Sequence, residues 1–562
     1  MQAKETSFLR FLQVPNQFRI PIFQRRYSWE EQHCDKLWQD ILRVGQDDEI
    51  PSHFLGSIVY IEPGIQNVSA ISESLVIDGQ QRLTTLSLLL LALGRAIGES
   101  GSEIGITPKQ ISNYYLFNAD EDGELRYRQL LTYHDKDTLI QLLENRELSS
   151  NASSRLVENY QFFETKLQKV SLKEVYAGIQ KLVIVDIALD RRYDDPQLIF
   201  ESLNSTGLNL TQADLIRNYV LMGQELDSQN KLYNDYWLPM EQRFGDAYTK
   251  QFDSFVRDYL TLKRQQITNI DDVYETFKMH VPKQTTPDAL ETIIAEISGY
   301  SKHYVRIALG KEENTKLRNC FADINTLKVT VAFPFLLEVY EDYTQGCIQK
   351  SEFIEILRLV ESYVFRRAIC DIPTNSLNRT FAGRLMPKVN KSNYLESLKK
   401  AFLDLSEQSS SYRYPKDSEF KQEFLVKGVY NNLERCQYLL RKLENHENKQ
   451  PIHCIEDYTI EHVMPQNPDL SDEWKEELGE NWQEVQEKYL HTIGNLTLTG
   501  YNPELSDRSF GEKKEHEPGG FRDSRLRLND SLLWVRKWNE DAILARAEGL
   551  AEKAIKIWAY PK

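Results

Sequence analysis

Residues 75–82 read LVIDGQQR, and residues 83–93 continue as LTTLSLLLLAL. The first stretch is an apolar run that ends at Asp78 and Gly79, which predicts a buried strand followed by a turn. The second stretch predicts a buried helix that begins directly after the turn. Such a junction presents free backbone N–H groups and the positive end of the helix dipole, which together suit an anion. We therefore expect a nucleotide or phosphate pocket here, and an ordinary Asp-Gly turn is the alternative.

Each polar residue of this turn has a role that it could play in such a pocket. Arg82 can bind a phosphate through two N–H groups, and Asp78 can hold a metal ion or a ribose hydroxyl. The amides of Gln80 and Gln81 can orient either group. The sequence contains no Walker-type Gly-x-x-x-x-Gly-Lys-Ser/Thr stretch that would support nucleotide binding independently.

A second stretch near the start of the chain favours the same kind of site. Residues 19–29, RIPIFQRRYSW, bring the guanidinium groups of Arg25 and Arg26 together with aromatic side chains. Phosphate recognition uses guanidinium groups, and base stacking uses aromatic faces. The alternative is that Tyr27 and Trp29 only close the start of the helix that follows.

A third stretch, residues 199–222, reads IFESLNSTGLNLTQADLIRNYVLM. Thr211 and Asp214 form a pair like a capping box, which predicts that a helix begins there. Asn204 lies in the loop before that helix. The polar groups of this loop either reach a ligand or only satisfy the turn.

Length and composition predict a folded protein of several domains. The chain has 562 residues, of which 41% are hydrophobic and 11% aromatic, and its formal charge is −16. This length exceeds what one hydrophobic core usually organises. The acidic total counts against nonspecific coating by nucleic acid, although it allows a local basic cleft. Because no signal peptide or membrane-length apolar run is found, we expect a cytoplasmic protein without a membrane partner.

The pattern along the chain predicts three blocks in an α+β, mostly helical protein. Residues 1–225 alternate strands, such as residues 53–62 and 181–189, with helices, as α/β or α+β domains do. Residues 226–405 follow helical periodicity and form a helical middle region. Residues 406–562 form the last block, which begins with the polar stretch SEQSSSYRYPKDSE.

Four ordered motifs of the first block resemble a known family: IPIFQRRYSW, FLGSIV, VIDGQQRLTTL and FESLNSTGLNLTQADLIRN. They are similar to the N-terminal DGQQR domain of GmrSD-type, modification-dependent (type IV) restriction endonucleases. The resemblance implies a ParB-like α/β domain that binds and hydrolyses a nucleoside triphosphate, with GTP, CTP, UTP and ATP not distinguished. The nucleotide-binding residues that it implies are Asp78, Gly79, Gln80, Gln81, Arg82, Arg25, Arg26 and Asn204.

The last block contains residues suited to cleavage of a phosphodiester. Its stretch YTIEHVMPQNP places Glu461 beside His462 at the end of a predicted strand. A one-metal phosphodiesterase needs a neutral His to deprotonate water and oxygen ligands that hold Mg²⁺ at the phosphate. Glu461 and Asn502 can supply such oxygens, and Asn495 can brace the loop that carries the His. Neighbours on a strand point to opposite faces, so Glu461 and His462 need a bend or the strand's end to serve one site.

The motifs IEHVMP, GNLTL and YNPELSDRSFGEKK are similar to the HNH (His-Me finger) nuclease domain that accompanies the DGQQR domain in these restriction proteins. The resemblance implies a ββα-metal fold, His462 as general base and Asn495 as the bracing residue. It also implies Glu461 and Asn502 as ligands of Mg²⁺ or Mn²⁺, and Lys513 as a phosphate contact. Glu461 departs from the commoner pattern, in which Asp precedes the His, and its longer side chain could shift the metal.

For several other polar residues the sequence allows two roles. His453 and His491 flank the nuclease motif as further candidate ligands, but we expect solvated or packed roles for both. His33, near the first arginine cluster, is equally ambiguous. In the middle region, Arg366 and Arg367 could line a DNA path, and surface salt bridges are the alternative.

Taken together, these features predict a nucleotide-regulated, metal-dependent endonuclease that nicks or cleaves modified phage DNA in antiphage defence. Glucosylated hydroxymethylcytosine is one modification that the resemblance suggests. The expected partners are modified double-stranded DNA and a nucleoside triphosphate, and a homodimer is allowed. Two alternatives stay open: an NTP-hydrolysing sensor whose nuclease domain is inactive, and an RNA-directed nuclease with the same metal site.

Overall fold

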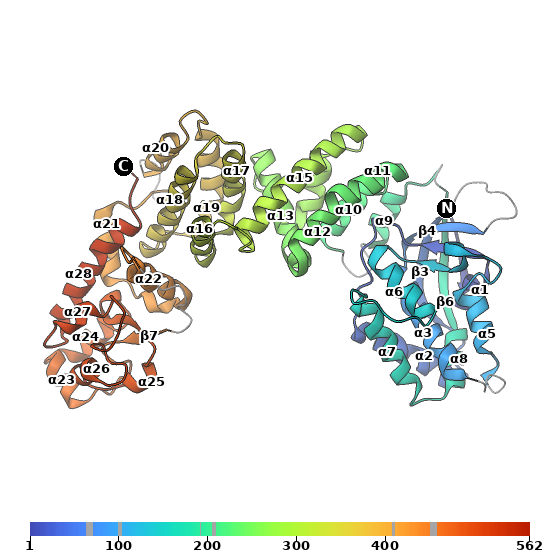
Figure 1. The fold of residues 1–562 in the computed structure, drawn as a ribbon, viewed down its shortest axis with the longest axis horizontal. Coiled ribbons are helices and arrows are strands. Elements are labelled where there is room, and N and C mark those ends of the chain that lie inside the picture. The colour runs from blue at the N-terminus through green and yellow to red at the C-terminus, as the bar shows by residue number, and fades with distance from the viewer. Residues whose placement is uncertain are drawn as a thin grey trace. The chain divides into compact units, whose positions relative to one another are not determined.

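The computed structural model describes residues 1–62, 71–98, 104–190, 193–204, 210–406, 411–449 and 458–561. Within these residues the chain is mostly helical, with a six-stranded mixed sheet in its N-terminal part and a two-stranded sheet in its C-terminal part (Figure 1). The chain divides into two compact units. The first unit is Met1–Glu241 with Val281–Ile294, and the second is Gln242–His280 with Ala295–Lys562.

The first unit is built around the six-stranded sheet, in the order β1-β6-β3-β4-β2-β5. Its strands are β1 (Gln2–Ser7), β2 (Asn16–Arg19), β3 (His53–Glu62), β4 (Ser72–Asp78), β5 (Gln129–Leu130) and β6 (Leu182–Asp190). Strand β2 is parallel to β4 and β5, β3 is parallel to β6, and the pairs β1–β6 and β3–β4 are antiparallel. The strands predicted at residues 53–62 and 181–189, and the one ending at Asp78, are confirmed.

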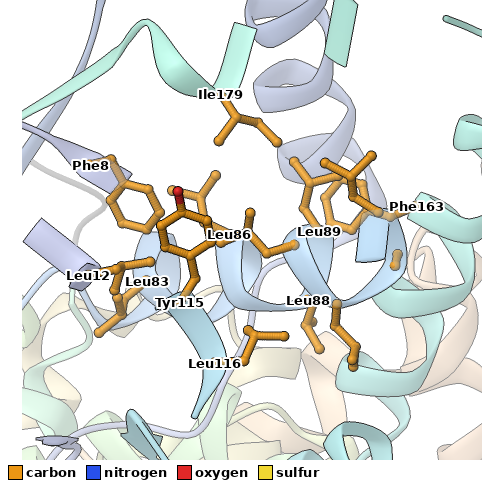
Figure 2. Packing of buried hydrophobic residues seen from close by; sticks show 14 of the residues in the cluster. Phe8, Leu12, Leu83, Leu86, Leu88, Leu89, Tyr115, Leu116, Phe163 and Ile179 are labelled. Atoms are coloured by element: carbon orange, nitrogen blue, oxygen red, sulfur yellow. The ribbon is translucent and has the colours of Figure 1, made fainter. Parts of the chain in front are cut away.

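Helix α3 (Gln80–Ile97) follows β4 directly and forms the centre of this unit's core. Its leucines are buried on nearly every side, as the continuous apolar run predicts. Figure 2 shows the side chains that pack together there: Leu83, Leu86, Leu88 and Leu89 of α3 with Phe8, Leu12, Tyr115, Leu116, Phe163 and Ile179. Because the helix is enclosed in this way, its N-terminal turn is held rigidly at the end of β4.

The other α-helices of the first unit surround this core or follow it in the chain. They are α1 (Phe8–Gln13), α2 (Glu31–Gln46), α5 (Pro108–Ile111), α6 (Tyr133–Leu143), α7 (Ser154–Leu167), α8 (Leu172–Gln180), α9 (Pro196–Asn204), α10 (Gln212–Leu221) and α11 (Leu226–Lys231). Helices α12 (Leu238–Phe244) and α15 (Pro287–Ala308) each contain a point at which the chain passes from one unit to the other.

The second unit is helical apart from its short sheet. Its helices before that sheet are α13 (Tyr248–Arg264), α14 (Val273–His280), α16 (Thr315–Thr326), α17 (Phe333–Thr344), α18 (Lys350–Ile369), α19 (Leu377–Thr380), α20 (Tyr394–Ser406), α21 (Asp417–Val426) and α22 (Leu433–Asn445). The helices that follow β7 are α23 (Asp472–Leu478), α24 (Trp482–Tyr489), α25 (Asn502–Leu505), α26 (Phe510–Glu515), α27 (Asp530–Leu533) and α28 (Glu540–Ile557). No described helix is both long enough and apolar enough to cross a bilayer.

These two units differ from the three predicted blocks. The predicted boundary at residue 405 falls inside the second unit, because helices on both sides of it share one core. Phe365 of α18 stacks on Trp558, which directly follows α28, with ring centroids 4.1 Å apart. Phe365 also contacts Phe420 of α21 and Tyr438 of α22. Shared aromatic packing therefore joins the helical middle region to the last block.

The short sheet consists of β7 (Thr459–His462) and β8 (Leu496–Thr499), which are antiparallel. His462 is opposite Leu496, and Glu461 is opposite Thr497. The short helices α25 and α26 follow β8 in the chain. The order strand, strand, helix is the one that a ββα arrangement requires, and assignment of this part to the HNH fold stays a prediction.

Candidate functional site

The turn between β4 and α3 has the backbone geometry of an open helix start. Gly79 precedes the helix with a φ of 95°, a left-handed conformation that glycine adopts at little cost. No side chain caps the helix, so the N–H groups of its first turn, Gln80 to Arg82, lack an intrahelical partner. This arrangement of free N–H groups and helix dipole favours a bound anion.

We expect Gly79→Ala to lower the free energy of unfolding of the first unit by about 1–3 kcal/mol. A Cβ at this position would lie 3.0 Å from Ile58 Cγ1 and 3.1 Å from the carbonyl oxygen of Ser57, in addition to the left-handed backbone. Denaturant unfolding of full-length protein measures the change. Gly94→Ala in the same helix is the control, because its Cβ would meet only Ile111 at 3.4 Å. Equal stability of the two variants would contradict the strain.

The side chains of Asp78 and Arg82 bind each other across this turn. Arg82 Nη2 lies 3.0 Å from Asp78 Oδ2, and Arg82 Nη1 donates to the carbonyl oxygen of Leu55 at 3.1 Å. Gly56 makes room for this guanidinium, because a Cβ there would lie 1.9 Å from Arg82 Nη1. The FLGSIV motif therefore meets the DGQQR motif at Arg82.

Gln81 ties the arginine-rich motif to the same turn. Its Oε1 accepts hydrogen bonds from the backbone N–H groups of Ser28 (2.9 Å) and Trp29 (3.2 Å), and its Nε2 donates to the carbonyl oxygen of Arg26. Gln24 donates to the carbonyl oxygen of Ile77 at 2.7 Å. The chain therefore brings these two predicted motifs together through side-chain bonds to the backbone.

Arg217 connects the fourth motif, residues 200–218, to the arginine-rich stretch near the start of the chain. The sequence pattern did not predict a role for it. Its Nε donates to the carbonyl oxygen of Phe23 at 3.0 Å, and its other nitrogens bind Asp214 (2.8 Å) and Glu241 (2.7 Å). The spacing of three between Asp214 and Arg217 on a helix was the available signal. Thr211 accepts a hydrogen bond from the N–H of Asp214 at 3.1 Å, which confirms the predicted start of α10.

Three of the predicted nucleotide-binding residues have side chains that could take a ligand. Gln80 is 4% exposed, and neither its Oε1 nor its Nε2 forms a hydrogen bond within the described residues. Arg25 is half-buried and Arg26 is exposed, and neither forms an ion pair in that part of the chain. Arg26 borders a polar pocket of about 360 Å³, whose other lining residues are Thr132, Lys136, Asp137, Thr138, Ser149, Asn151, Tyr233 and Leu238. The side chain of Asn204 and residues 205–209 lie outside the described residues.

In the second unit, His462 ends β7 and contacts two aromatic rings. Its Nε2 lies 3.2 Å from Nδ1 of His491. The ring of Tyr430 meets it edge to face at 4.5 Å between centroids and stacks on His491. The imidazole is only 3% exposed, and burial, with smaller contributions from His491 and Lys513, lowers the pKa of His462 to about 3. His462 is therefore neutral at physiological pH.

Glu461 points toward a different partner, as neighbouring residues on a strand do. Lys513 Nζ lies 2.6 Å from Glu461 Oε1 and donates to the carbonyl oxygen of His462 at 2.8 Å. Burial raises the pKa of Glu461, and the charge of Lys513 opposes that shift. The ammonium of Lys513 is fully buried, so a direct contact with phosphate would require this ion pair to open, and the contact stays a prediction.

Two side-chain oxygens at this strand are candidate ligands of a hard cation. Asn502 donates through Nδ2 to the carbonyl oxygen of Ile460 at 2.8 Å, which holds it at the strand beside Glu461. Its Oδ1 and the Oε2 of Glu461 form no hydrogen bond within the described residues, so both are available. Magnesium accepts one or two such oxygens together with retained waters. No group of three or more His, Cys, Asp and Glu residues suited to a metal occurs in the described part of the chain.

Asn495 binds Met464, in the loop that follows His462, and Leu490, which directly precedes His491. Its Oδ1 accepts from the N–H of Met464 at 2.7 Å and from Nε1 of Trp538 at 3.1 Å. Its Nδ2 donates to the carbonyl oxygens of Met464 (3.1 Å) and Leu490 (3.0 Å). The residue after Leu490 is His491, so Asn495 connects the chain segments that carry both histidines.

Arg366 and Arg367, the predicted DNA contacts, are almost completely buried, which counts against a direct contact with DNA in this structure. Arg366 donates to the carbonyl oxygens of Trp558 and Pro415 and binds Asp417. Arg367 donates to the carbonyl oxygens of Ser411 and Pro373. These arginines connect α18 to loops of the last block.

The structure describes two of the three histidines for which the sequence allowed two roles. His491 is packed, but against His462 itself, and neither this contact nor the one from Tyr430 was predicted. No local pattern indicates Tyr430, because it lies in a short helical turn (Val429–Asn431) far from His462 in the sequence. His33 accepts a hydrogen bond from the N–H of Glu30 and stacks on Trp29, so it caps α2. His453 lies outside the described residues.

Comparison with protein families identifies the class of protein as a restriction endonuclease. Residues 8–221 match the family model described as GmrSD restriction endonuclease, N-terminal domain, and residues 414–553 match GmrSD restriction endonucleases, C-terminal domain. The chain belongs to the GmrSD restriction endonuclease family, as the motifs predicted, and a restriction endonuclease acts on DNA. No curated protein matches the sequence.

Proposed function

We propose that this restriction endonuclease cuts modified phage DNA in a metal-dependent and nucleotide-regulated reaction, with His462 as the general base. The observation that carries the proposal is the buried, neutral imidazole at the end of β7, whose following loop is held by Asn495 at Met464. A general base must be unprotonated at the working pH, and the lowered pKa of His462 meets that requirement.

In the proposed reaction, His462 removes a proton from the water that attacks phosphorus. His491 binds Nε2 of His462, which leaves Nδ1 to accept this proton. Glu461 and Asn502 would hold Mg²⁺ or Mn²⁺, which supplies charge stabilisation at the phosphate and the leaving oxygen. Departure of the 3′ oxygen leaves a 3′-hydroxyl. Because His462 is only 3% exposed, water and DNA reach its imidazole only when the Tyr430 side chain that covers it moves.

The nucleotide is proposed to bind in the first unit, at the start of α3. Its phosphates would accept hydrogen bonds from the N–H groups of Gln80 to Arg82, and the unpaired amide of Gln80 would complete the contact. The charge of Arg26 lies at the border of a polar pocket of about 360 Å³, a size within the usual range for a small-molecule site. The bound nucleotide would regulate cleavage.

The test is cleavage of modified phage DNA beside matched unmodified DNA, with Mg²⁺ or Mn²⁺ and each nucleoside triphosphate in turn. Cutting that requires modified DNA, metal and one nucleotide is the expected result. Preferential cutting of RNA would instead establish the RNA-directed alternative. Nucleotide hydrolysis without cutting of any substrate would establish the sensor with an inactive nuclease domain.

We expect Gln80→Leu to separate ligand binding from folding. A buried amide without partners costs about 1–3 kcal/mol, so replacing it by an apolar side chain of similar size should leave the melting temperature unchanged or raise it. The same change should reduce the rise in melting temperature that the activating nucleotide produces in the wild-type protein. Thermal unfolding with and without nucleotide measures both effects. A lower melting temperature without nucleotide, together with an unchanged response to nucleotide, would contradict this role for Gln80.

A further inference from the structure

The burial of the predicted DNA contacts leaves open which cations of this chain meet DNA. Arg366, Arg367 and Lys513 each have their charged groups inside the protein. The chain as a whole carries a formal charge of −16, which repels a polyanion. A restriction endonuclease of this charge needs a local, exposed group of cations, because phosphate neutralisation dominates the affinity of proteins for DNA.

Residues 522–537, RDSRLRLNDSLLWVRK, are such a group, and we name them the basic segment. The segment contains five arginine and lysine residues against two aspartates, so its charge is opposite in sign to that of the whole chain. It lies inside the range 414–553 that matches the C-terminal domain of the family.

The basic segment is held against the strand that pairs with β7. Asn529, which is 1% exposed, binds the hydroxyl of Thr497 and donates to the carbonyl oxygen of Leu498. Thr497 is the cross-strand partner of Glu461. Directly after the segment, Trp538 donates to Asn495, the residue that braces the His462 loop. The middle of the segment and the residue that follows its end are therefore attached next to the candidate nuclease site.

Within the segment, apolar side chains point inward and charged ones point outward. Leu526, Leu528 and Leu532 are buried, whereas Arg522, Arg525, Arg527, Arg536 and Lys537 are exposed. Arg522 pairs with Glu515, but Arg525, Arg536 and Lys537 form no ion pair within the described residues. Guanidinium groups without carboxylate partners are free to bind phosphate oxygens.

Trp534 adds a second kind of group to this surface. Its side chain is 88% exposed, although Leu533 and Val535 on either side of it pack against the core of this domain. The side chain therefore projects outward at a position that the backbone fixes. A rigid, exposed indole beside unpaired arginines is the combination that stacks on bases or sugars while the cations bind the backbone.

We propose that the basic segment is a DNA-binding surface, on which Arg525, Arg536 and Lys537 bind backbone phosphates and Trp534 packs against a base or sugar. The inference rests on the proposed function only in taking DNA as the substrate. The opposite charges of the segment and of DNA select this partner. The segment holds the duplex beside the strand pair that carries Glu461 and His462.

The test measures binding without cleavage. Full-length His462→Ala protein is titrated, in EDTA and with and without nucleoside triphosphate, into a fluorescein-labelled duplex of modified phage DNA at several salt concentrations, and anisotropy gives Kd. Arg525→Gln/Arg536→Gln/Lys537→Gln and Trp534→Ala are introduced separately into this background. Lys316→Gln/Lys400→Gln/Lys553→Gln is the matched control, because these three lysines are exposed cations of the same unit without ion pairs in the described residues. Melting temperatures verify that the exposed substitutions leave the fold intact.

The triple variant should weaken binding at least tenfold and reduce the slope of log Kd against log salt by about 2–3, since each lost phosphate contact removes about 0.9. Trp534→Ala should weaken binding roughly fivefold to a hundredfold, with Trp534→Phe restoring part of it. The control should bind like the parent protein. An unchanged Kd and slope in the triple variant overturns the surface and leaves the proposed function intact. Absence of DNA binding by the parent overturns both, and tighter binding of an RNA duplex through the same residues overturns the choice of DNA.

Discussion

His462→Ala is expected to reduce DNA cleavage by about 10²- to 10⁴-fold, the usual contribution of a positioned general base. The substitution removes the proposed proton acceptor, a neutral imidazole that its Nε2 contact with His491 holds in place. Single-turnover cleavage of modified DNA under saturating metal and nucleotide measures the loss. His516→Ala, a change at a half-buried histidine of the same domain, should cut at the wild-type rate.

Binding and folding controls make this result specific. The His462→Ala protein should keep its circular dichroism spectrum and its response to nucleotide, because the nucleotide is proposed to bind in the other unit. Cleavage within threefold of wild type would remove His462 as the base. Equal loss in His516→Ala would show that the assay reports stability instead of chemistry.

The lowered pKa of His462 gives the same prediction a pH signature. The pKa of about 3 belongs to the free protein with the ring covered, so His462 should not cause a loss of cleavage at subsaturating DNA, which reports the free enzyme, as the pH falls from 8 to 5. The unfolded chain binds this proton near pH 6.5, so the stability that the neutral ring contributes is present above that pH and is lost progressively as the pH falls toward 3. If cleavage by the wild-type protein fell with a midpoint near pH 6.5, and the His462→Ala protein did not show this fall, the result would contradict the buried neutral ring.

Arg546→Met is expected to have the largest effect on stability, about 3–5 kcal/mol of the free energy of unfolding of the second unit. Arg546 of α28 is almost fully buried, and burial lowers the pKa of its guanidinium. Its Nη1 donates to the carbonyl oxygens of Ile493, Gly494 and Leu496 at 2.8–3.1 Å, and its Nη2 to that of Leu528. Met fills similar space but leaves these four acceptors without their donor.

Urea unfolding, followed by a probe in the second unit, measures the change, and Lys553→Met is the control. Lys553 lies on the same helix but is exposed, so its substitution should change the stability by less than about 0.5 kcal/mol. The Arg546→Met protein should also lose cleavage, because the carbonyls it releases belong to the turn that contains Asn495 and to the start of β8. A loss of stability below about 1 kcal/mol would show that α28 is held by its apolar face alone.

The elements that were predicted correctly from the sequence are those that residues adjacent in the chain encode. The strand that ends at Asp78, the turn at Gly79 and the helix over residues 80–97 were predicted almost to the residue. An apolar run, an Asp-Gly turn and a leucine-rich helix are each encoded by neighbouring residues, so no distant partner is needed to read them. The four motifs were also sufficient to identify the family, because their order and spacing are properties of the sequence alone.

Burial of charged groups was decided by the tertiary structure. Arg367 reads as a surface cation beside Arg366, yet it donates to Ser411 from 44 residues away. Lys513 reads as a phosphate contact, yet it pairs with Glu461, 52 residues earlier in the chain. In each case the partner is distant in the sequence and comes close only when the chain folds. The contact between His491 and His462 forms in the same way. The sequence by itself therefore determined the family, the start of α3 and the identity of the candidate base, because these depend on local order. Only the tertiary structure decided which of its cations stay in water and which side chains cover that base, because burial depends on residues that are distant in the chain.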